Sequence, residues 1–127
     1  MSAPVIIVVD DEALLRWAVA ESLIAAGFSV CQAESAAGAV QCLENAQETP
    51  LVVVLDLKLP DSSDLSLARK IMSERPDAPV IMMTAHGSSQ DKAEAEAAGV
   101  FKFIQKPFDL SEMTSVVRAA TAKLTAR

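Results

Sequence analysis

The sequence predicts an α/β protein built on a parallel sheet, with helices on both faces. One observation is the run Leu51–Asp56, in which five apolar residues lead directly into a lone carboxylate. Such a run is typical of a short strand that is buried on both faces. A second observation is that similar runs alternate along the chain with segments of helical periodicity, which is the pattern of βαβ units.

Two more strands and two helices are expected before that run. Residues 5–9 are all apolar and predict a fully buried strand that ends at Asp10. Residues 13–26 carry apolar side chains three and four positions apart, as an amphipathic helix does. Residues 28–33 alternate between apolar and polar side chains, which predicts an edge strand. Residues 35–46 are expected to form a helix capped by the serine at its start.

A third helix and a fourth strand are expected after the run. The polar loop that follows it offers Ser63 or Asp64 as the cap of a helix that ends near residue 73. Residues 80–83 are apolar and predict a strand that ends at Thr84.

The last segments complete five strands and five helices. Residues 88–99 are rich in alanine and glutamate, so we expect a helix with few buried side chains. Residues 100–104 predict the fifth strand, and Ser111 is expected to cap the last helix. Together these elements predict a flavodoxin-like (βα)5 fold, a doubly wound parallel sheet with strand order 2-1-3-4-5.

Composition narrows the classes of protein. The chain has 127 residues, a length typical of one domain, and we expect a single domain over residues 1–127. Its net charge is −6 and its lysines and arginines form no run, which argues against direct binding of nucleic acid. It has no stretch of 18 apolar residues that could span a membrane and no basic leader, so a cytoplasmic location is expected.

Three side chains have ordinary structural interpretations. Cys31 and Cys42 do not form a Cys-x-x-Cys pair and are expected to be two buried, reduced thiols. Trp17 is expected to pack half-buried on the first helix.

The candidate functional residues follow the ends of the strands. Asp10 and Asp11 follow the first strand, Asp56 ends the third, Thr84 ends the fourth, and Lys106 lies just beyond the fifth. These strands are neighbours in the expected order, so the side chains converge on one edge of the sheet, where open α/β folds bind ligands. Singly, each residue has an ordinary explanation as a helix cap, a turn residue or a surface charge. Their placement at one edge favours a site.

The residue types at this edge favour phosphoryl transfer. Three carboxylates in one crevice repel one another, so either one of them is protonated or a cation lies among them. An all-oxygen cluster suits Mg²⁺. The ammonium of Lys106 and the hydroxyl of Thr84 can bind the oxygens of a phosphoryl group. Asp56 is then the candidate nucleophile, which forms an acyl phosphate.

Four motifs around these residues resemble a known family. The motifs VDDE, LDLKLP, MTA and FIQKPF, at residues 9–12, 55–60, 83–85 and 103–108, are similar to the receiver domain of two-component response regulators. The resemblance covers the whole chain in order. It implies a switch that accepts a phosphoryl group from a histidine kinase or a phosphotransfer protein.

The resemblance also implies a role for each of seven residues. The phosphoacceptor is Asp56; Mg²⁺ is held by Asp10, Asp11, Asp56 and the backbone carbonyl of Lys58; the phosphoryl group is contacted by Thr84 and Lys106; the aromatic switch residue is Phe103. The bond between Lys106 and Pro107 is expected to be cis. Phosphorylation is expected to change the surface of the fourth helix, fifth strand and fifth helix, where a homodimer partner or an effector docks.

Further features refine the resemblance. The motifs LRW and TAHG, at residues 15–17 and 84–87, are similar to receivers of nitrogen-regulation-type activators, which usually attach an ATPase and a DNA-binding domain. This chain is then either a stand-alone receiver or a piece of a longer regulator. His86 and Lys58 either flank the phosphoryl group and tune its hydrolysis or are exposed loop residues. Residues 61–64 (DSSD) replace the family's common Gly-x-x-Asp-Gly, which leaves the shape of that loop open.

Other functions are disfavoured. A phosphatase of the haloacid-dehalogenase type normally has a second aspartate two residues after the nucleophile, where Lys58 stands. Without that acid we expect slow turnover and a persistent acyl phosphate, so the chain is expected to be a switch and not an enzyme. A flavodoxin needs a Ser/Thr/Gly phosphate loop after the first strand, and a nucleotide hydrolase needs Gly-x-x-x-x-Gly-Lys; the sequence has neither.

Overall fold

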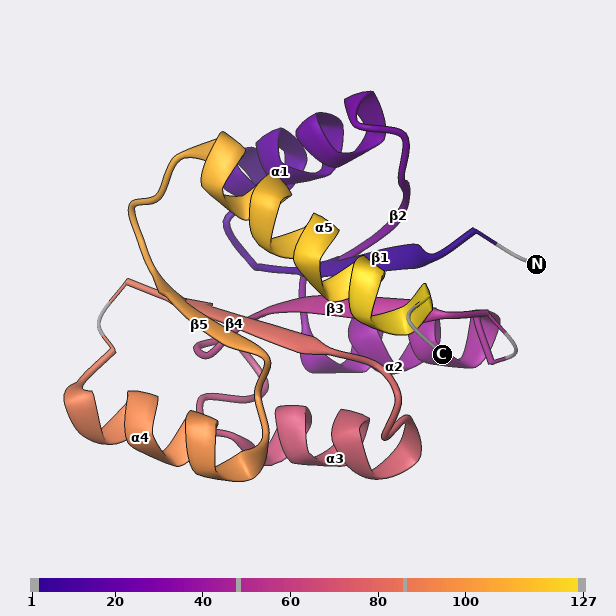
Figure 1. Cartoon of the computed structure of the whole chain (residues 1–127). Helices are drawn as coiled ribbons and strands as arrows, with labels where there is room; N and C mark the ends of the chain where they lie inside the picture. Colours follow the sequence, from indigo (N-terminus) through magenta and orange to yellow (C-terminus); the bar gives the residue numbers. More distant parts are fainter. Residues whose placement is uncertain (1–2, 48, 86, 126–127) are drawn as a thin grey trace.

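The computed structural model describes residues 3–47, 49–85 and 87–125, and within them five strands and five helices alternate along the chain (Figure 1). The strands are β1 (Val5–Val9), β2 (Ser29–Ala33), β3 (Leu51–Asp56), β4 (Val80–Thr84) and β5 (Lys102–Gln105). The helices are α1 (Ala13–Ala25), α2 (Ala36–Asn45), α3 (Ser66–Glu74), α4 (Ser89–Ala98) and α5 (Leu110–Thr125).

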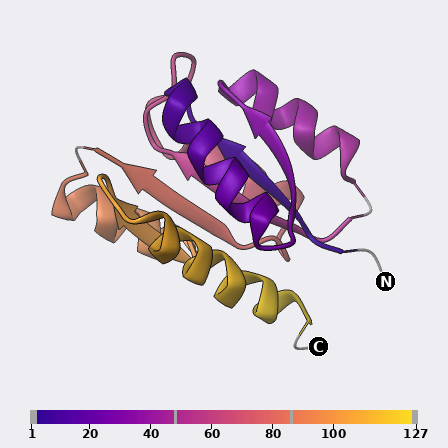
Figure 2. The ribbon, with the colours of Figure 1, turned by 90° about the horizontal axis from the view of Figure 1, so that it is seen from above.

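All five strands are parallel and lie in the order β2-β1-β3-β4-β5, which confirms the predicted sheet. Helices α1 and α5 cover one face, and α2, α3 and α4 cover the other, as the two views show (Figures 1 and 2). Strand β2 lies at the edge, as its mixed composition predicted. The two layers leave the carboxyl ends of the strands together at one rim.

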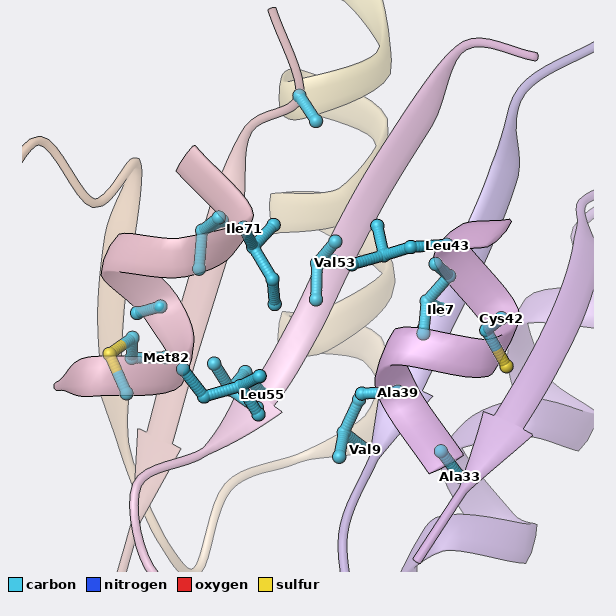
Figure 3. Packing of buried hydrophobic residues seen from close by; sticks show 14 of the residues in the cluster. Ile7, Val9, Ala33, Ala39, Cys42, Leu43, Val53, Leu55, Ile71 and Met82 are labelled. Atoms are coloured by element: carbon cyan, nitrogen blue, oxygen red, sulfur yellow. The ribbon is translucent and has the colours of Figure 1, made fainter. Parts of the chain in front are cut away.

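Side chains on each strand point alternately to the two helix layers, because the side-chain period of a strand is two. Ile7, Val53 and Met82 pack towards α2, α3 and α4 (Figure 3). Ile6 and Val52 pack towards α1 and α5. Each such side chain stabilises the fold by about 1.5–3 kcal/mol when fully buried. Burial on both faces explains why the sequences of these strands are continuous apolar runs. It also makes the sheet rigid, so the residues at its carboxyl edge are held in fixed positions.

The two cysteines correct a prediction. Cys31 on β2 and Cys42 on α2 form a disulfide, so the expectation of two reduced thiols is wrong for this structure. Their Cα atoms are 6.3 Å apart, within the range that a disulfide spans. The two cysteines are 11 positions apart in the sequence and meet because α2 packs on β2. The sequence has no motif that indicates this contact. Cys42 is buried as predicted (Figure 3).

Trp17 also differs from its prediction. The residue is 56% exposed and belongs to the exposed large apolar residues, so it packs less than expected. The buried face of α1 holds Val19 and Leu23, one turn apart. Trp17 lies two positions before Val19, and at 100° per residue this places it on the opposite side of the helix.

The helix caps are partly as predicted. Ser35 caps α2 and Ser88 caps α4, the latter in a reciprocal capping box with Asp91. Helix α3 begins later than expected, because Asp64 accepts the backbone N–H of Ser66 at 2.9 Å and holds residues 64–66 in a turn. Neither Ser63 nor Asp64 is the residue that immediately precedes α3.

The final strand and helix also shift at their starts. Strand β5 begins at Lys102, two residues after the predicted start. Ser111 lies inside α5 and does not cap it, because the helix already begins at Leu110 and the backbone carbonyl of Asp109 accepts its first hydrogen bonds.

The loop between β3 and α3 is tied to α2 by a side chain. The carboxylate of Asp61 accepts the backbone N–H of Ala36 at 2.7 Å and that of Ala37 at 3.1 Å. These two donors would otherwise lack partners at the start of α2. They hold the pKa of Asp61 below its usual value. Asp61 therefore fixes the position of the loop that follows Asp56.

We expect Asp61→Asn to lower the melting temperature at pH 7, because one amide oxygen replaces two carboxylate oxygens as acceptor. The pKa of Asp61 is lower in the folded state, so its contribution is present above pH 3.8, the ordinary value, and is lost as the pH falls further. Melting curves of wild type and variant should therefore converge in acid. Glu44→Gln, an exposed charge removed from α2, is the control. A constant difference between wild type and Asp61→Asn at all pH values would contradict the ionic cap.

Within the described residues, no helix combines the length and the apolar character needed to cross a bilayer.

Candidate functional site

The predicted site residues lie together at the rim formed by the carboxyl ends of β1, β3, β4 and β5. Val9 is level with Leu55 across β1 and β3, so Asp10 and Asp56 follow as neighbours. Thr84 is level with Gln105 across β4 and β5, and the backbone N–H of Lys106 donates to the carbonyl of Thr84 at 2.8 Å. Strand pairing alone thus brings distant parts of the sequence to one place.

Lys106 is the central cation of the site. Its ammonium donates to Asp10 Oδ2 at 2.8 Å, to Glu12 Oε1 at 2.7 Å and to Asp56 Oδ2 at 2.9 Å. The side chain of Lys106 is only 8% exposed. The carboxylate repulsion predicted from the sequence is therefore relieved in part by a cation of the chain itself.

The two buried aspartates are held through their second oxygens as well. Asp10 Oδ1 accepts the backbone N–H of Glu12 at 2.8 Å, and Asp56 Oδ1 accepts that of Lys58 at 3.0 Å. The guanidinium of Arg16 donates to the backbone carbonyl of Asp10 at 2.9 Å. Both carboxylates consequently have fixed orientations, which a reacting group or a metal ligand requires.

Burial and ion pairing act in opposite directions at this site. Burial raises the pKa of Asp10, although the ammonium of Lys106 and the N–H of Glu12 oppose that rise. Burial would lower the pKa of Lys106, but its hydrogen bonds to Asp10, Glu12 and Asp56 outweigh that effect and raise the pKa of Lys106 above its usual value. Lys106 therefore carries a positive charge at neutral pH.

Asp10, Asp11 and Asp56 form a group that can hold a metal ion. One carboxylate oxygen from each lies within 4.8 Å of those of the other two. Asp10 and Asp56 are buried, whereas Asp11 is exposed at the mouth of the site. An all-oxygen set with one open side fits a hard divalent ion such as Mg²⁺, which keeps several waters and binds through few carboxylates. The residues present thus fit the ion that the resemblance implies.

Thr84 and Phe103 meet at Gly87, which the sequence did not single out. Thr84 is buried and Phe103 is half-buried. A methyl group added at Gly87 would lie 2.5 Å from Thr84 Cγ2 and 2.8 Å from Phe103 Cζ. A Cβ atom does not come this close to another carbon atom in real proteins, so a side chain at Gly87 would force Thr84 or Phe103 to shift.

Three other predictions concern residues near the rim. The backbone N–H of Lys58 donates to Asp56 and its side chain is exposed, while the role of its backbone carbonyl as a metal ligand stays a prediction. The bond between Lys106 and Pro107 is cis. His86 lies outside the described residues, and its role stays a prediction.

The sequence did not place Glu12 among the residues of the site. Its side chain is 59% exposed and reaches Lys106, although 94 residues separate the two. Its position next to Asp10 and Asp11 in the sequence was the one indication of a role in the site. Only the fold shows that Glu12 and Asp10 accept hydrogen bonds from the same lysine.

A family model of the response regulator receiver domain matches residues 6–118. The chain therefore belongs to the response regulator receiver domain family, the signalling switches of two-component systems.

Individual relatives agree with this assignment. The chain is 33% identical over 120 residues to the DNA-binding transcriptional regulator NtrC of Escherichia coli K12, a match that covers 94% of this chain and 25% of NtrC. The receiver domain of NtrX from Brucella abortus is 31% identical, with a TM-score of 0.80 over 96% of this chain and 99% of that one. A receiver domain from Methanospirillum hungatei JF-1, at 23% identity, shares the fold with a TM-score of 0.89 over 98% of both chains. This chain thus spans about a quarter of the length of NtrC.

Proposed function

We propose that Asp56 is the phosphoacceptor of this receiver and that Mg²⁺ assists the transfer. Asp10, Asp11 and Asp56, with the backbone carbonyl of Lys58, would hold the ion, which when bound neutralises phosphoryl oxygens. Lys106 and Thr84 bind the remaining oxygens, the lysine through its charge and the threonine through its hydroxyl. The carboxylate of Asp56 attacks phosphorus, and the leaving group of the donor departs with its electron pair.

One observation carries this proposal: the ammonium of Lys106 donates to Asp56 Oδ2 at 2.9 Å beside a cluster of three carboxylates. A carboxylate in this position has a fixed cation to stabilise the added negative charge of an acyl phosphate. No acidic side chain stands two residues after Asp56, where the aspartate nucleophiles of phosphatases have their general acid.

We expect acetyl phosphate with Mg²⁺ to add one phosphoryl group per chain, without sustained turnover. Intact-mass spectrometry measures the adduct, and release of phosphate from a generic phosphomonoester measures turnover. A site that lacks a positioned acid should stay well below about one event per second, the lower end of ordinary enzyme rates. Steady hydrolysis at or above that rate would move the interpretation to a phosphatase.

We expect Mg²⁺ to raise the melting temperature of the wild type, because an ion that binds only the folded state stabilises it by mass action. At about 100 times its Kd, the gain is about 2.7 kcal/mol, or roughly 10 °C for a chain of this length. Asp11→Ala removes an exposed ligand and should abolish most of the gain, while Asp64→Ala, outside the cluster, should not. An Asp11→Ala protein with the wild-type Mg²⁺ titration would contradict the site.

The proposed donor is a histidine kinase or a phosphotransfer protein. A groove of about 430 Å³ opens beside Lys106 and offers a donor side chain access to the site. Its lining consists of Glu12, Leu15, Ala85, Lys106, Pro107 and Phe108. The proposed output is a change in the surface of α4, β5 and α5, which a second receiver or an effector would bind.

We further propose that residues 1–127 form a single receiver domain that acts in the cytoplasm, where such a donor would meet it.

A further inference from the structure

The ammonium of Lys106 has no donor to spare in this structure. A lysine ammonium has three N–H donors. One donates to Asp10, one to Glu12 and one to Asp56, at 2.7–2.9 Å. The donor that now contacts Asp56 can pass to the phosphoryl group that Asp56 receives. A second donor from Lys106 to that group has to come from the bond to Asp10 or the bond to Glu12.

The three carboxylates differ in what it costs to release them. Asp10 is fully buried and also accepts the backbone N–H of Glu12, so its carboxylate cannot turn into solvent if its bond to Lys106 breaks. Asp56 carries the incoming group and stays in contact with the lysine through it. Glu12 is 59% exposed, so water can solvate its carboxylate as soon as it turns away. Glu12 is therefore the partner that leaves at the lowest cost.

Release of Glu12 also leaves the adjacent helix intact. Glu12 immediately precedes α1, but its side chain makes no capping hydrogen bond there. Its backbone carbonyl accepts the N–H of Arg16 at 2.9 Å, and its backbone N–H donates to Asp10. The side chain can thus rotate into solvent while the backbone contacts of Glu12 persist.

We infer that Glu12 is a positioning residue that holds the third donor of Lys106 until a phosphoryl group replaces it. Glu12 and the phosphoryl group then compete for the same N–H. This inference rests on the proposed role of Asp56. It adds that the carboxylate of Glu12 competes with the phosphoryl group for Lys106 and so weakens the binding of that group. Loss of the competitor should favour the phosphorylated form.

The test uses beryllofluoride, a mimic of the phosphoryl group, at saturating Mg²⁺ on the full chain. Glu12→Gln replaces a charged acceptor by a neutral one, so beryllofluoride should bind about two- to fivefold more tightly, the range for an exposed ion pair. Glu12→Asp keeps the charge but is one methylene shorter, so its carboxylate loses the contact with Lys106. It should tighten binding to a similar extent. Glu21→Gln, an exposed charge on α1, is the matched control and should bind as wild type does.

The aspartate variant separates competition from simple repulsion. If Glu12 only repelled the anion, Glu12→Asp would bind beryllofluoride as wild type does, and that result would overturn the inference. A second measurement needs no variant: the carboxyl ¹³C resonance of Glu12 in wild type should move on addition of beryllofluoride to the Mg²⁺-loaded protein. An unmoved resonance would also overturn it. Wild type that binds no beryllofluoride would contradict the proposed function itself.

Discussion

Asp56→Asn is expected to abolish the phosphoryl adduct completely. An amide cannot form an acyl phosphate, because the attacking carboxylate oxygen is missing. The substitution keeps the shape of the side chain and an oxygen that can accept from Lys106, so the fold should persist. Intact mass after incubation with acetyl phosphate and Mg²⁺ should show one adduct in wild type and none in the variant.

The control for this experiment is Asp64→Asn, in the loop after β3. Asp64 is exposed and accepts from Ser66, so its loss should leave the adduct unchanged. Hydroxylamine, which cleaves acyl phosphates, should remove the wild-type adduct and confirm its chemistry. If Asp56→Asn still gained a hydroxylamine-labile phosphate, another carboxylate at the rim, such as Asp10 or Asp11, would be the acceptor.

The sequence predicted the sheet well because its signals are redundant. Strand β1 is apolar throughout, and β3 and β4 are apolar up to their last residue, since both of their faces are buried. A polar residue stands at the rim end of each: Asp10 after β1, Asp56 as the last residue of β3 and Thr84 as the last residue of β4. The parallel order then brings Asp10, Asp56, Thr84 and Lys106 together without any detail of side-chain packing. Because the order of the strands determines where these residues lie, a correct prediction of that order was sufficient to predict that they lie together.

The errors have two causes: the disulfide depends on a contact between distant segments, whereas the exposure of Trp17 follows from its position around the helix axis. Cys31 and Cys42 meet only because α2 packs on β2, and no local pattern reports that contact. Trp17 is large and apolar but lies on the outer side of α1. The role of Asp61 as a cap for a helix that precedes it by 25 residues was equally invisible in the sequence.

The residues missed at the site share one property: they act on a predicted residue and not on the ligand. Glu12 occupies a donor of Lys106, and Gly87 limits the space beside Thr84 and Phe103. Such residues set how readily the predicted groups can move. Sequence motifs identify the reacting groups, but they do not show which hydrogen bonds and packing contacts hold those groups in place. These contacts are visible only in the structure.

Helix α4 is the element best able to respond to the site. Among its described residues only Ala95 is buried, so few apolar contacts hold it against the sheet. It follows the loop that contains Gly87 and precedes β5, where Phe103 lies. A phosphoryl group that attracts Thr84 can therefore shift α4 through contacts already present. A difference of a few kcal/mol in the free energy of two states is enough to change their populations.

Thr84→Ala is expected to confine the response to beryllofluoride to the rim. In wild type with Mg²⁺, the added group should attract the Thr84 hydroxyl through a charge-assisted hydrogen bond. That movement vacates space beside Phe103 and lets its ring turn. Amide chemical shifts should then change from Gln90 to Phe103 as well as around Asp10, Asp56 and Lys106. Without the hydroxyl, only the shifts around the rim should change.

Thr84→Ser is the matched control, because it keeps the hydroxyl and removes only the methyl group. It should restore the shift changes from Gln90 to Phe103, whereas a purely steric role of Thr84 would leave it as deficient as alanine. Gly87→Ala probes the other side of the same contact: its methyl group should displace the ring of Phe103 before any ligand is added. If wild-type shifts never extend beyond the rim, the α4–β5–α5 surface does not carry the output.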